Sequence, residues 1–366
     1  MVNIPFLKKF TLPDLDLKFM KPVSSFVGID IGGSSIKVLE LKKEKDRAGL
    51  ETYGELKTAG YFKHGGGLGG GVLRYLDSEI AEAVTDVLKE SNVGTAAANF
   101  SIPATSAFIT LFDLPRLKLE DIQSAIPFEA KKYIPVSLSE VSIDWEIIDE
   151  KDQERVRVLL VAVPNDVINK FKRVAELSHL DIQALEVDSF SLARSLVGRD
   201  KAVTMIINIG APSTTMVIVD GVLRLSHNID SGSAEITRVL AQGLSITPER
   251  ADAFKRNVGL SNKPEEKEIA DIITPIIDSI FQEALRAMAT YTRSHNKKIE
   301  RIILAGGGAN LYGLVDYTAQ TFGVETVKAN PFSRVVYPAF MQPILKDIGP
   351  AFSVAAGLAL RAISSR

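Results

Sequence analysis

Two stretches of similar design decide the predicted fold: FVGIDIGGSSIKVLEL at residues 26–41 and TMIINIGAPSTTMVIV at residues 204–219. Each stretch places a turn of small residues between two apolar runs, which predicts a strand, a tight turn and a second strand. When the stretches are aligned, Asp30 coincides with Asn208 and Gly32 coincides with Gly210. The second stretch therefore carries an amide where the first carries a carboxylate.

The length and composition indicate a globular protein with more than one domain. The chain has 366 residues, of which 46% are apolar and 24% are charged, whereas single cores rarely exceed roughly 250 residues. A net charge of −2 without a long basic block gives no electrostatic footprint for nucleic acid. The absence of cysteine excludes disulfides and thiolate metal sites and fits a reducing compartment. The histidines lack metal-ligand spacing; they are His64, His179, His227 and His295.

The N-terminal segment, MVNIPFLKKFTLPDLDLKFMKP, does not have the pattern of a signal peptide, because Pro13, Asp14 and Asp16 interrupt its apolar residues. No uninterrupted apolar run in the chain reaches the roughly 18 to 20 residues that a spanning helix needs. We therefore expect a cytoplasmic protein. The segment reads either as a docking or membrane-surface tail or as a loosely ordered terminus.

Periodic apolar residues predict the main helices. One helix is expected over 77–92, and another over 247–260 with Thr247 as its cap and Pro248 at its first position. The longest is expected over 268–295. The order strand, helix, strand, strand, helix over 105–183 predicts a small α+β subdomain.

The segment HGGGLGGG at residues 64–71 is rich in glycine, as phosphate-binding loops are. A phosphate loop needs a strand that leads into it and a helix N-terminus or strand that holds its amides, and the strand signal before His64 is weak. We interpret this segment as a flexible surface loop.

Three other turns follow apolar strands and have the residues that an anion site needs. Small residues allow the backbone to approach phosphate oxygens, and Ser or Thr hydroxyls add hydrogen-bond donors. Asp30, at the end of its strand, has the oxygen ligand that Mg²⁺ prefers, directly or through water. The candidate nucleotide-binding residues in the turns are Gly32, Gly33, Ser34, Ser35, Gly210, Ala211, Ser213, Thr214, Thr215, Gly306, Gly307, Gly308 and Asn310.

The order of these motifs resembles the actin-like ATPase superfamily, an α/β class with a two-domain, ribonuclease-H-like fold. The stretches at 26–41 and 204–219 resemble its two phosphate motifs, and RIILAGGGANLYGL resembles its adenosine motif. ALEVDSFSLARSL and PAFSVAAGLALRA look like its two connecting helices. The resemblance implies ATP and Mg²⁺ as ligands and explains the repeated hairpin as the trace of two similar domains.

Within that superfamily the chain resembles the PilM family of type IV pilus assembly proteins, relatives of the division protein FtsA. The carrying segments are AIPFEAKKYIPVSLSEVSIDWEII at 125–148, DSFSLARS at 188–195 and DSGSAEITRVLAQGLSITPERADAFKR at 230–256. The domain boundaries that follow are a tail at 1–23, domain I at 24–104, an inserted subdomain of FtsA/PilM type at 105–183, a return to domain I at 184–200, domain II at 201–349 and a closing helix at 350–366.

The resemblance also assigns candidate roles outside the turns. Glu186 and Asp188 fall near the helix that often supplies the water-orienting group, although both are equally compatible with structural pairing. Glu283 is a candidate for the ribose hydroxyls. The superfamily usually has an acidic residue at the position of Asn208, and an amide lacks the charge to hold Mg²⁺ or to orient a water. We therefore expect ATP binding with slow or absent hydrolysis.

The function implied by the resemblance is that of an ATP-binding scaffold at the cytoplasmic face of the inner membrane. It would dock the cytoplasmic N-terminal peptide of PilN and link it to motor ATPases, with self-association also open. An extended peptide needs an apolar groove, and the candidate lining residues are Phe112, Leu114, Phe128 and Ile134. The alternatives are an FtsA-like filament protein and a sugar kinase of the actin-like fold.

Overall fold

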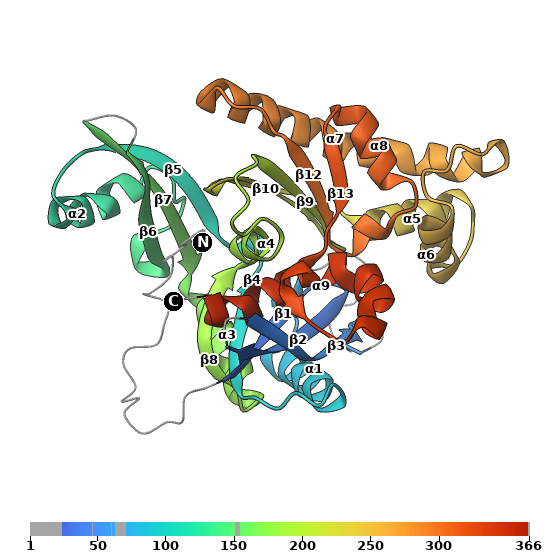
Figure 1. Ribbon diagram of the computed structural model, residues 1–366, viewed down its shortest axis with the longest axis horizontal. Coiled ribbons are helices and arrows are strands. Elements are labelled where there is room, and N and C mark those ends of the chain that lie inside the picture. The colour runs from blue at the N-terminus through green and yellow to red at the C-terminus, as the bar shows by residue number, and fades with distance from the viewer. Residues whose placement is uncertain (1–23, 46, 60, 63–70, 151–153, 365–366) are drawn as a thin grey trace.

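The computed structural model describes residues 24–45, 47–59, 61–62, 71–150 and 154–364, and it has α/β architecture built on three sheets (Figure 1). The predictions for the N-terminal tail and for most of the segment 64–71 lie outside the described residues.

The first sheet contains the first predicted hairpin, which is confirmed. β1 and β2 pair antiparallel, with Ile31 opposite Ile36 around the turn, and β1 pairs in parallel with β4. Side chains alternate between the two faces, so Val27 and Ile29 pack toward α1 and α3 while Gly28 packs against α9. The elements, in sheet order and then the covering helices, are β14 (Val335–Val336), β3 (Arg47–Lys57), β2 (Ser35–Glu44), β1 (Ser25–Ile31), β4 (Ala97–Ile102), β8 (Asp181–Val187), α1 (Asp77–Glu90), α3 (Asn165–Leu177) and α9 (Gln342–Ser364).

The second sheet contains the second predicted hairpin, β9 with β10, and β9 also pairs in parallel with β12. One face packs on the long helix α7, whose predicted apolar stripe is confirmed as core, and the Thr247 hydroxyl caps α6 as expected. The elements are β11 (Val222–Ile229), β10 (Thr214–Asp220), β9 (Thr204–Ile209), β12 (Arg301–Ala305), β13 (Glu325–Lys328), α5 (Ser233–Gly243), α6 (Pro248–Asn257), α7 (Lys267–His295) and α8 (Leu314–Phe322).

The small sheet has the order β5-β7-β6, and α2 covers one of its faces to form a separate core. The bounds are β5 (Phe108–Pro115), α2 (Leu119–Ala130), β6 (Val141–Glu150) and β7 (Arg155–Pro164). The opposite face contributes Leu159, Val161 and Val163 to the core of the first sheet. Helix α3 follows in the chain but packs on α1. The small sheet thus projects to one side of the molecule (Figure 1).

Two helices connect the first and second sheets: α4 (Asp188–Leu196) and α9. They cross where Gly357 of α9 meets the backbone of α4, since a Cβ atom at Gly357 would lie 2.0 Å from the Ser191 carbonyl oxygen. The predicted connecting helix over 184–196 is wrong at its start. Residues 184–187 instead extend β8 in parallel pairing with β4.

Among the described residues one stretch is long and apolar enough to cross a membrane, Ala339–Ile363, which consists of a short turn before α9 and nearly all of α9. Of its most apolar window, 67% is buried inside the molecule. Its composition is accounted for by packing on β1, β2 and α4.

Candidate functional site

Two carboxylates meet where β1 ends and α4 begins. The Ser101 hydroxyl donates to Asp30 Oδ1 over 2.8 Å, and the Asp188 carboxylate accepts hydrogen bonds from Ala104 and from Ser189, whose hydroxyl lies 3.3 Å from Oδ1. Burial raises the pKa of Asp188 to about 7, and the charge of Asp30 adds to this rise. Burial also raises the pKa of Asp30, against the charge of Lys37 and the bond from Ser101. This site favours a cation between the two groups.

Lys37 is the residue of this site that the sequence analysis missed. Asp30 and Lys37 are opposite partners in the β1–β2 pair, and Lys37 Nζ donates to the Ser35 hydroxyl over 2.6 Å and lies 3.6 Å from a carboxylate oxygen of Glu55. The turn itself closes with a hydrogen bond from Gly32 N–H to the Ser35 carbonyl. The available signal was a lysine between the apolar residues Ile36 and Val38, at the position facing Asp30.

The second turn is closed in the same way, by Gly210 N–H donating to the Ser213 carbonyl over 3.0 Å. The first amide of α5, at Ser233, donates to the Gly210 carbonyl over 2.8 Å, so this helix begins against the turn. Gly232 makes that approach possible, because a Cβ atom there would lie 2.5 Å from the Ala211 carbonyl oxygen. The sequence analysis missed Gly232, although a glycine directly before a predicted helix is a recognisable signal.

The two threonine hydroxyls of this second turn are already engaged in hydrogen bonds. Thr214 Oγ1 donates to the Ser231 carbonyl over 2.8 Å, and Thr215 Oγ1 donates to Asn228 Oδ1 over 3.0 Å. Ser213 is half-buried. Thr214 and Thr215 therefore shape the turn through these bonds.

The third turn lies beside the second because β12 and β9 are neighbours, with Ala305 opposite Asn208. Gly306 has φ +80°, and a Cβ atom there would lie 2.4 Å from the Ile209 carbonyl oxygen and 2.7 Å from Asn208 Oδ1. Gly307 is exposed, and a Cβ atom there would meet nothing within 4 Å. Glycine is required at Gly306, whereas Gly307 opens onto free space.

A cleft of about 310 Å³ begins behind this turn, between α6, the start of α8 and β13. Asn310 lies at its wall, where its amide donates to the Asp347 carbonyl over 3.2 Å and its oxygen lies 3.3 Å from Lys328 Nζ. Arg256 and Tyr312 also line it. An exposed ring and two cations beside a glycine turn are suited to a flat, polar ligand such as a nucleobase with its ribose.

Glu186, paired with Asp188 in the sequence analysis, occupies a different environment. It is 1% exposed. Its carboxylate oxygens accept hydrogen bonds from Arg194 over 2.6 and 2.7 Å and from Arg361 over 2.5 Å. Burial alone would raise the pKa of Glu186, but the charges of both arginines and the bonds from Arg194 and Ser191 lower it to about 2. Glu186 ties β8 to α4 and α9, which is the structural pairing that the sequence left open.

Glu283 lies on α7 and is not brought together with the turns by any contact among the described residues. Its carboxylate contacts Arg286 over 2.6 Å and lies 3.9 Å from His227 of β11. The candidate ribose contact of this residue remains untested.

The predicted partner groove needs correction. Phe112, Leu114 and Ile134 are only 4 to 6% exposed because they face α2 and form the core of the small sheet, whereas Phe128 is 72% exposed. A cleft of about 340 Å³ lies instead between β5 and β11, and we call it the partner cleft. Its lining residues are Ala104, Ala107, Phe108, Ile109, Thr110, Tyr133, Ser226, His227 and Asn228.

The partner cleft and the carboxylate site share a wall. Ala104, which lines the cleft, hydrogen-bonds through its backbone to the Asp188 carboxylate. Ser226, which lines the other side, lies 2.7 Å from the Ser189 hydroxyl in a hydrogen bond. The N-terminal turn of α4 is therefore hydrogen-bonded to Ala104 and to β11, and its Asp188 lies close enough to Asp30 for their charges to interact.

No group of three or more His, Asp or Glu side chains lies close enough to hold a metal ion in the part of the chain that the structure describes. Asp30 and Asp188 fit a Mg²⁺ ion whose other ligands are phosphate oxygens and water, the mode this ion commonly adopts with nucleotides.

Comparisons with known proteins place the chain in a family. The model of the type IV pilus assembly protein PilM matches residues 28–363. A solved PilM–PilN type IV pilus biogenesis complex has a chain that superposes with a TM-score of 0.80 at 23% identity, covering 94% of this chain and 99% of that one.

More distant relatives share the architecture. The cell division protein FtsA of Enterococcus hirae is 21% identical over an alignment that covers 83% of this chain and 78% of that protein. MreB of Spiroplasma citri, solved with AMPPNP, has a TM-score of 0.52 at 14% identity and covers 92% of this chain and 95% of that one. The chain has the fold of the actin-like ATPases and belongs to the PilM family of type IV pilus assembly proteins.

Proposed function

We propose that the protein is an ATP-dependent docking scaffold of the pilus assembly platform, which binds the cytoplasmic N-terminal peptide of PilN in the partner cleft. The observation that carries this proposal is the N-terminal turn of α4, where Asp188 and Ser189 contact both the carboxylate site and the cleft walls at Ala104 and Ser226. A ligand that moves this turn at the carboxylate site would therefore also move the walls of the cleft, and a ligand in the cleft would move the carboxylate site.

ATP with Mg²⁺ is the proposed ligand of the three turns. Asp30 and Asp188 would hold the ion, Lys37 would neutralise phosphate charge, and Gly307 would leave room for the sugar and base against the backbone. The ion neutralises phosphate charge when bound. Asn208 has no negative charge with which to orient an attacking water. We therefore expect the protein to bind ATP without hydrolysing it rapidly.

The partner cleft suits an extended peptide with apolar side chains. Phe108, Ile109 and Tyr133 provide apolar surface, while Ser226 and Asn228 provide polar groups for a peptide backbone. Binding to PilN would bring this chain to the cytoplasmic face of the inner membrane. Contacts with motor ATPases and self-association would then use other surfaces.

Calorimetric titration of the full chain with a synthetic PilN N-terminal peptide, with and without Mg-ATP, tests the scaffold. We expect binding in both states and an affinity that ATP raises by about 5- to 150-fold, the usual range for coupled sites. Thr110→Trp, which fills the cleft, should abolish peptide binding and leave ATP binding intact. A peptide that binds in neither state, or that binds Thr110→Trp equally well, contradicts the proposal.

A further inference from the structure

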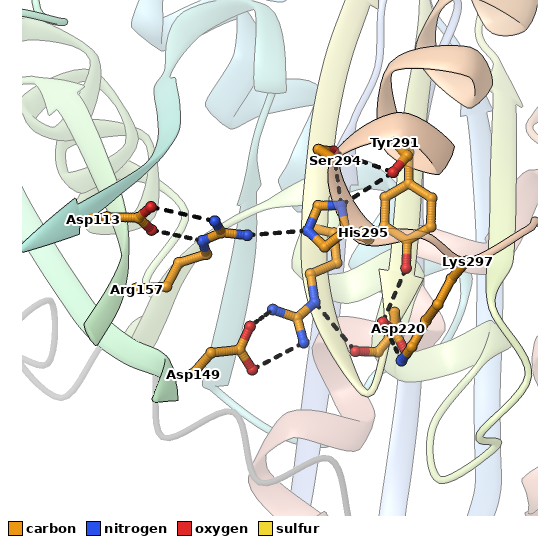
Figure 2. Close-up of polar contacts among 9 residues, drawn as sticks. Asp113, Asp149, Arg157, Asp220, Tyr291, Ser294, His295 and Lys297 are labelled. Carbon is orange, nitrogen blue, oxygen red and sulfur yellow. Dashed lines mark hydrogen bonds and ion pairs between the residues drawn. The ribbon is translucent and has the colours of Figure 1, made fainter. Parts of the chain in front are cut away.

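A cluster of charged side chains joins the small sheet to the second domain, by which we mean the second sheet with its helices (Figure 2). It contains two arginines, one from each side, and each arginine reaches a residue of the other part. The small sheet contributes Asp113 of β5, Asp149 of β6 and Arg157 of β7, and the second domain contributes Arg224 of β11 and His295 of α7.

Both arginines hold a carboxylate with two nitrogens. Arg157 contacts Asp113 over 2.8 and 3.4 Å, and its third nitrogen lies 3.2 Å from His295 Nε2. Arg224 contacts both oxygens of Asp149, one of them over 3.1 Å, and its Nε donates to the Asp220 carbonyl over 3.3 Å. The Arg224 side chain is 9% exposed. Forked pairs of this kind fix relative orientation as well as distance.

His295 takes part only as a neutral ring. Its Nδ1 lies 3.2 Å from the Tyr291 carbonyl and 2.9 Å from the Ser294 hydroxyl, which places the ring proton there and leaves Nε2 to accept from Arg157. Burial lowers the pKa of His295, and the charges of Arg157 and Arg224 lower it further, against the Tyr291 carbonyl and Asp220. A protonated ring would face two cations and lose its acceptor.

In this cluster His295 is the group whose ordinary pKa lies nearest to neutral pH. Burial opposes the ionisation of Asp220, but the hydrogen bonds from Lys297 over 2.8 Å and Tyr291 over 2.9 Å hold its pKa below the usual range. The hydrogen bond that Arg157 donates to Asp113 raises the pKa of Arg157, so that guanidinium stays charged.

The cluster adjoins the partner cleft along the same two strands. On β5 the cleft is lined by Ile109 and Thr110, and Asp113 follows them. On β11 the cleft is lined by 226–228, and Arg224 precedes them. The charged residues therefore lie where the small sheet and the second domain meet at one end of the cleft.

We propose that Arg157–His295 and Arg224–Asp149 form a latch that holds the small sheet against the second domain and thereby sets the width of the partner cleft. The ligand of the cleft rests on the proposed function, whereas the position of the small sheet does not. Opening the latch removes these polar contacts with the second domain, while Leu159, Val161 and Val163 keep the other face of the small sheet packed on the first sheet. In the unlatched fraction of the molecules, the partner cleft no longer has the width seen in the structure.

Spin labels can measure the latch directly, since the chain has no cysteine. Labels at Phe128→Cys on α2 and Gln282→Cys on α7 occupy exposed positions on the two sides. We expect a single narrow distance distribution for the labelled protein and a broad or second, longer distance after Asp149→Asn or after Arg157→Gln. Lys132→Ala, which breaks an exposed pair with Glu129 in the same subdomain, is the matched control and should change nothing. A distribution that stays narrow in both latch variants overturns the latch.

The same labels report on pH. Because the latched form binds the neutral ring, His295 has a lower pKa in that form than the ordinary 6.5, so latching is favoured above that value and lost as pH falls below it. We expect the distribution to broaden between pH 7.5 and pH 5.5, and His295→Gln, whose amide oxygen accepts from Arg157 without titrating, to stay narrow at both. Broadening that persists in His295→Gln contradicts the role of this residue.

Peptide affinity separates the two proposals. Asp149→Asn should weaken PilN peptide binding about tenfold, since only the latched fraction binds, and should leave the affinity for ATP alone within twofold. Equal peptide affinity in a variant whose label distances have changed would overturn the link between latch and cleft. If the unaltered protein binds no peptide, the proposed function fails, and the label distances still decide whether the latch exists.

Discussion

The two hairpin turns share one backbone design but differ in charge. Gly32 and Gly210 each donate to a carbonyl three residues on, over 3.0 Å in both turns. Behind the first turn the opposite partners are Asp30 and Lys37, and at the equivalent place behind the second turn they are Asn208 and Thr215. The two hairpins thus have the same turn. They differ in the cross-strand pair beside the turn, which is charged in the first hairpin and neutral in the second.

The largest expected effect comes from removing the charge of the first hairpin. Asp30→Asn should lower the affinity for Mg-ATP by about 10- to 100-fold, the cost typical of lost groups in metal sites. Titration of the full chain with ATP in the presence and absence of Mg²⁺ provides the measurement. If the loss is the same without Mg²⁺, Asp30 does not act through the ion.

Loss of the proton from Asp188 should make the ligand-free protein less stable as pH rises. The folded-state pKa of Asp188 is about 7 against the ordinary 3.8, so the folded chain binds the extra proton and its free energy of unfolding falls between about pH 4 and pH 7. Because Asp188 is partly exposed, we expect about 1 to 2 kcal/mol over that range. Asp188→Asn should flatten the profile in thermal unfolding from pH 5 to pH 8. A wild-type slope retained in that variant would assign it to another group.

Lys37→Met tests the other half of the charged pair. The variant keeps the apolar stem of the lysine but not its charge, so we expect about a tenfold loss of ATP affinity, equal to about 1.4 kcal/mol. Affinity for adenosine should not change, because it has no phosphate. A parallel loss for adenosine would mean that the substitution alters the fold of the turn.

The smallest change should come from restoring a carboxylate to the second hairpin. Asn208→Asp should raise phosphate release from a very low rate, measured under saturating Mg-ATP, with Asp30→Asn combined with Asn208→Asp as the inactive control. If the release rate does not rise, this position does not limit turnover.

Local patterns predicted much of the fold. The two hairpins, the stripe of α7 and the Thr247 cap follow from neighbours within a few residues, and the structure has all of them. The resemblance to actin-like ATPases, confirmed by the match over residues 28–363, supplied the topology that no local pattern gives.

The site was less predictable because it depends on partners far apart in the chain. Glu186 resembles Asp188 in the sequence, and only the fold brings Arg361 to it from 175 positions away. Lys37 belongs to the site because the register of β1 and β2 places it opposite Asp30. Phe112 is a core residue because α2 covers its face of the small sheet. The Arg157–His295 contact has no signal in the sequence at all.

The crossing of α4 and α9 at Gly357 has a mechanical consequence. Because the backbones touch there without an intervening side chain, a contact between two main chains sets how closely the two connecting helices approach. A methyl group at Gly357 would push α4 and α9 apart and displace the two sheets that they connect. The placement of the two sheets therefore depends on the absence of one side chain.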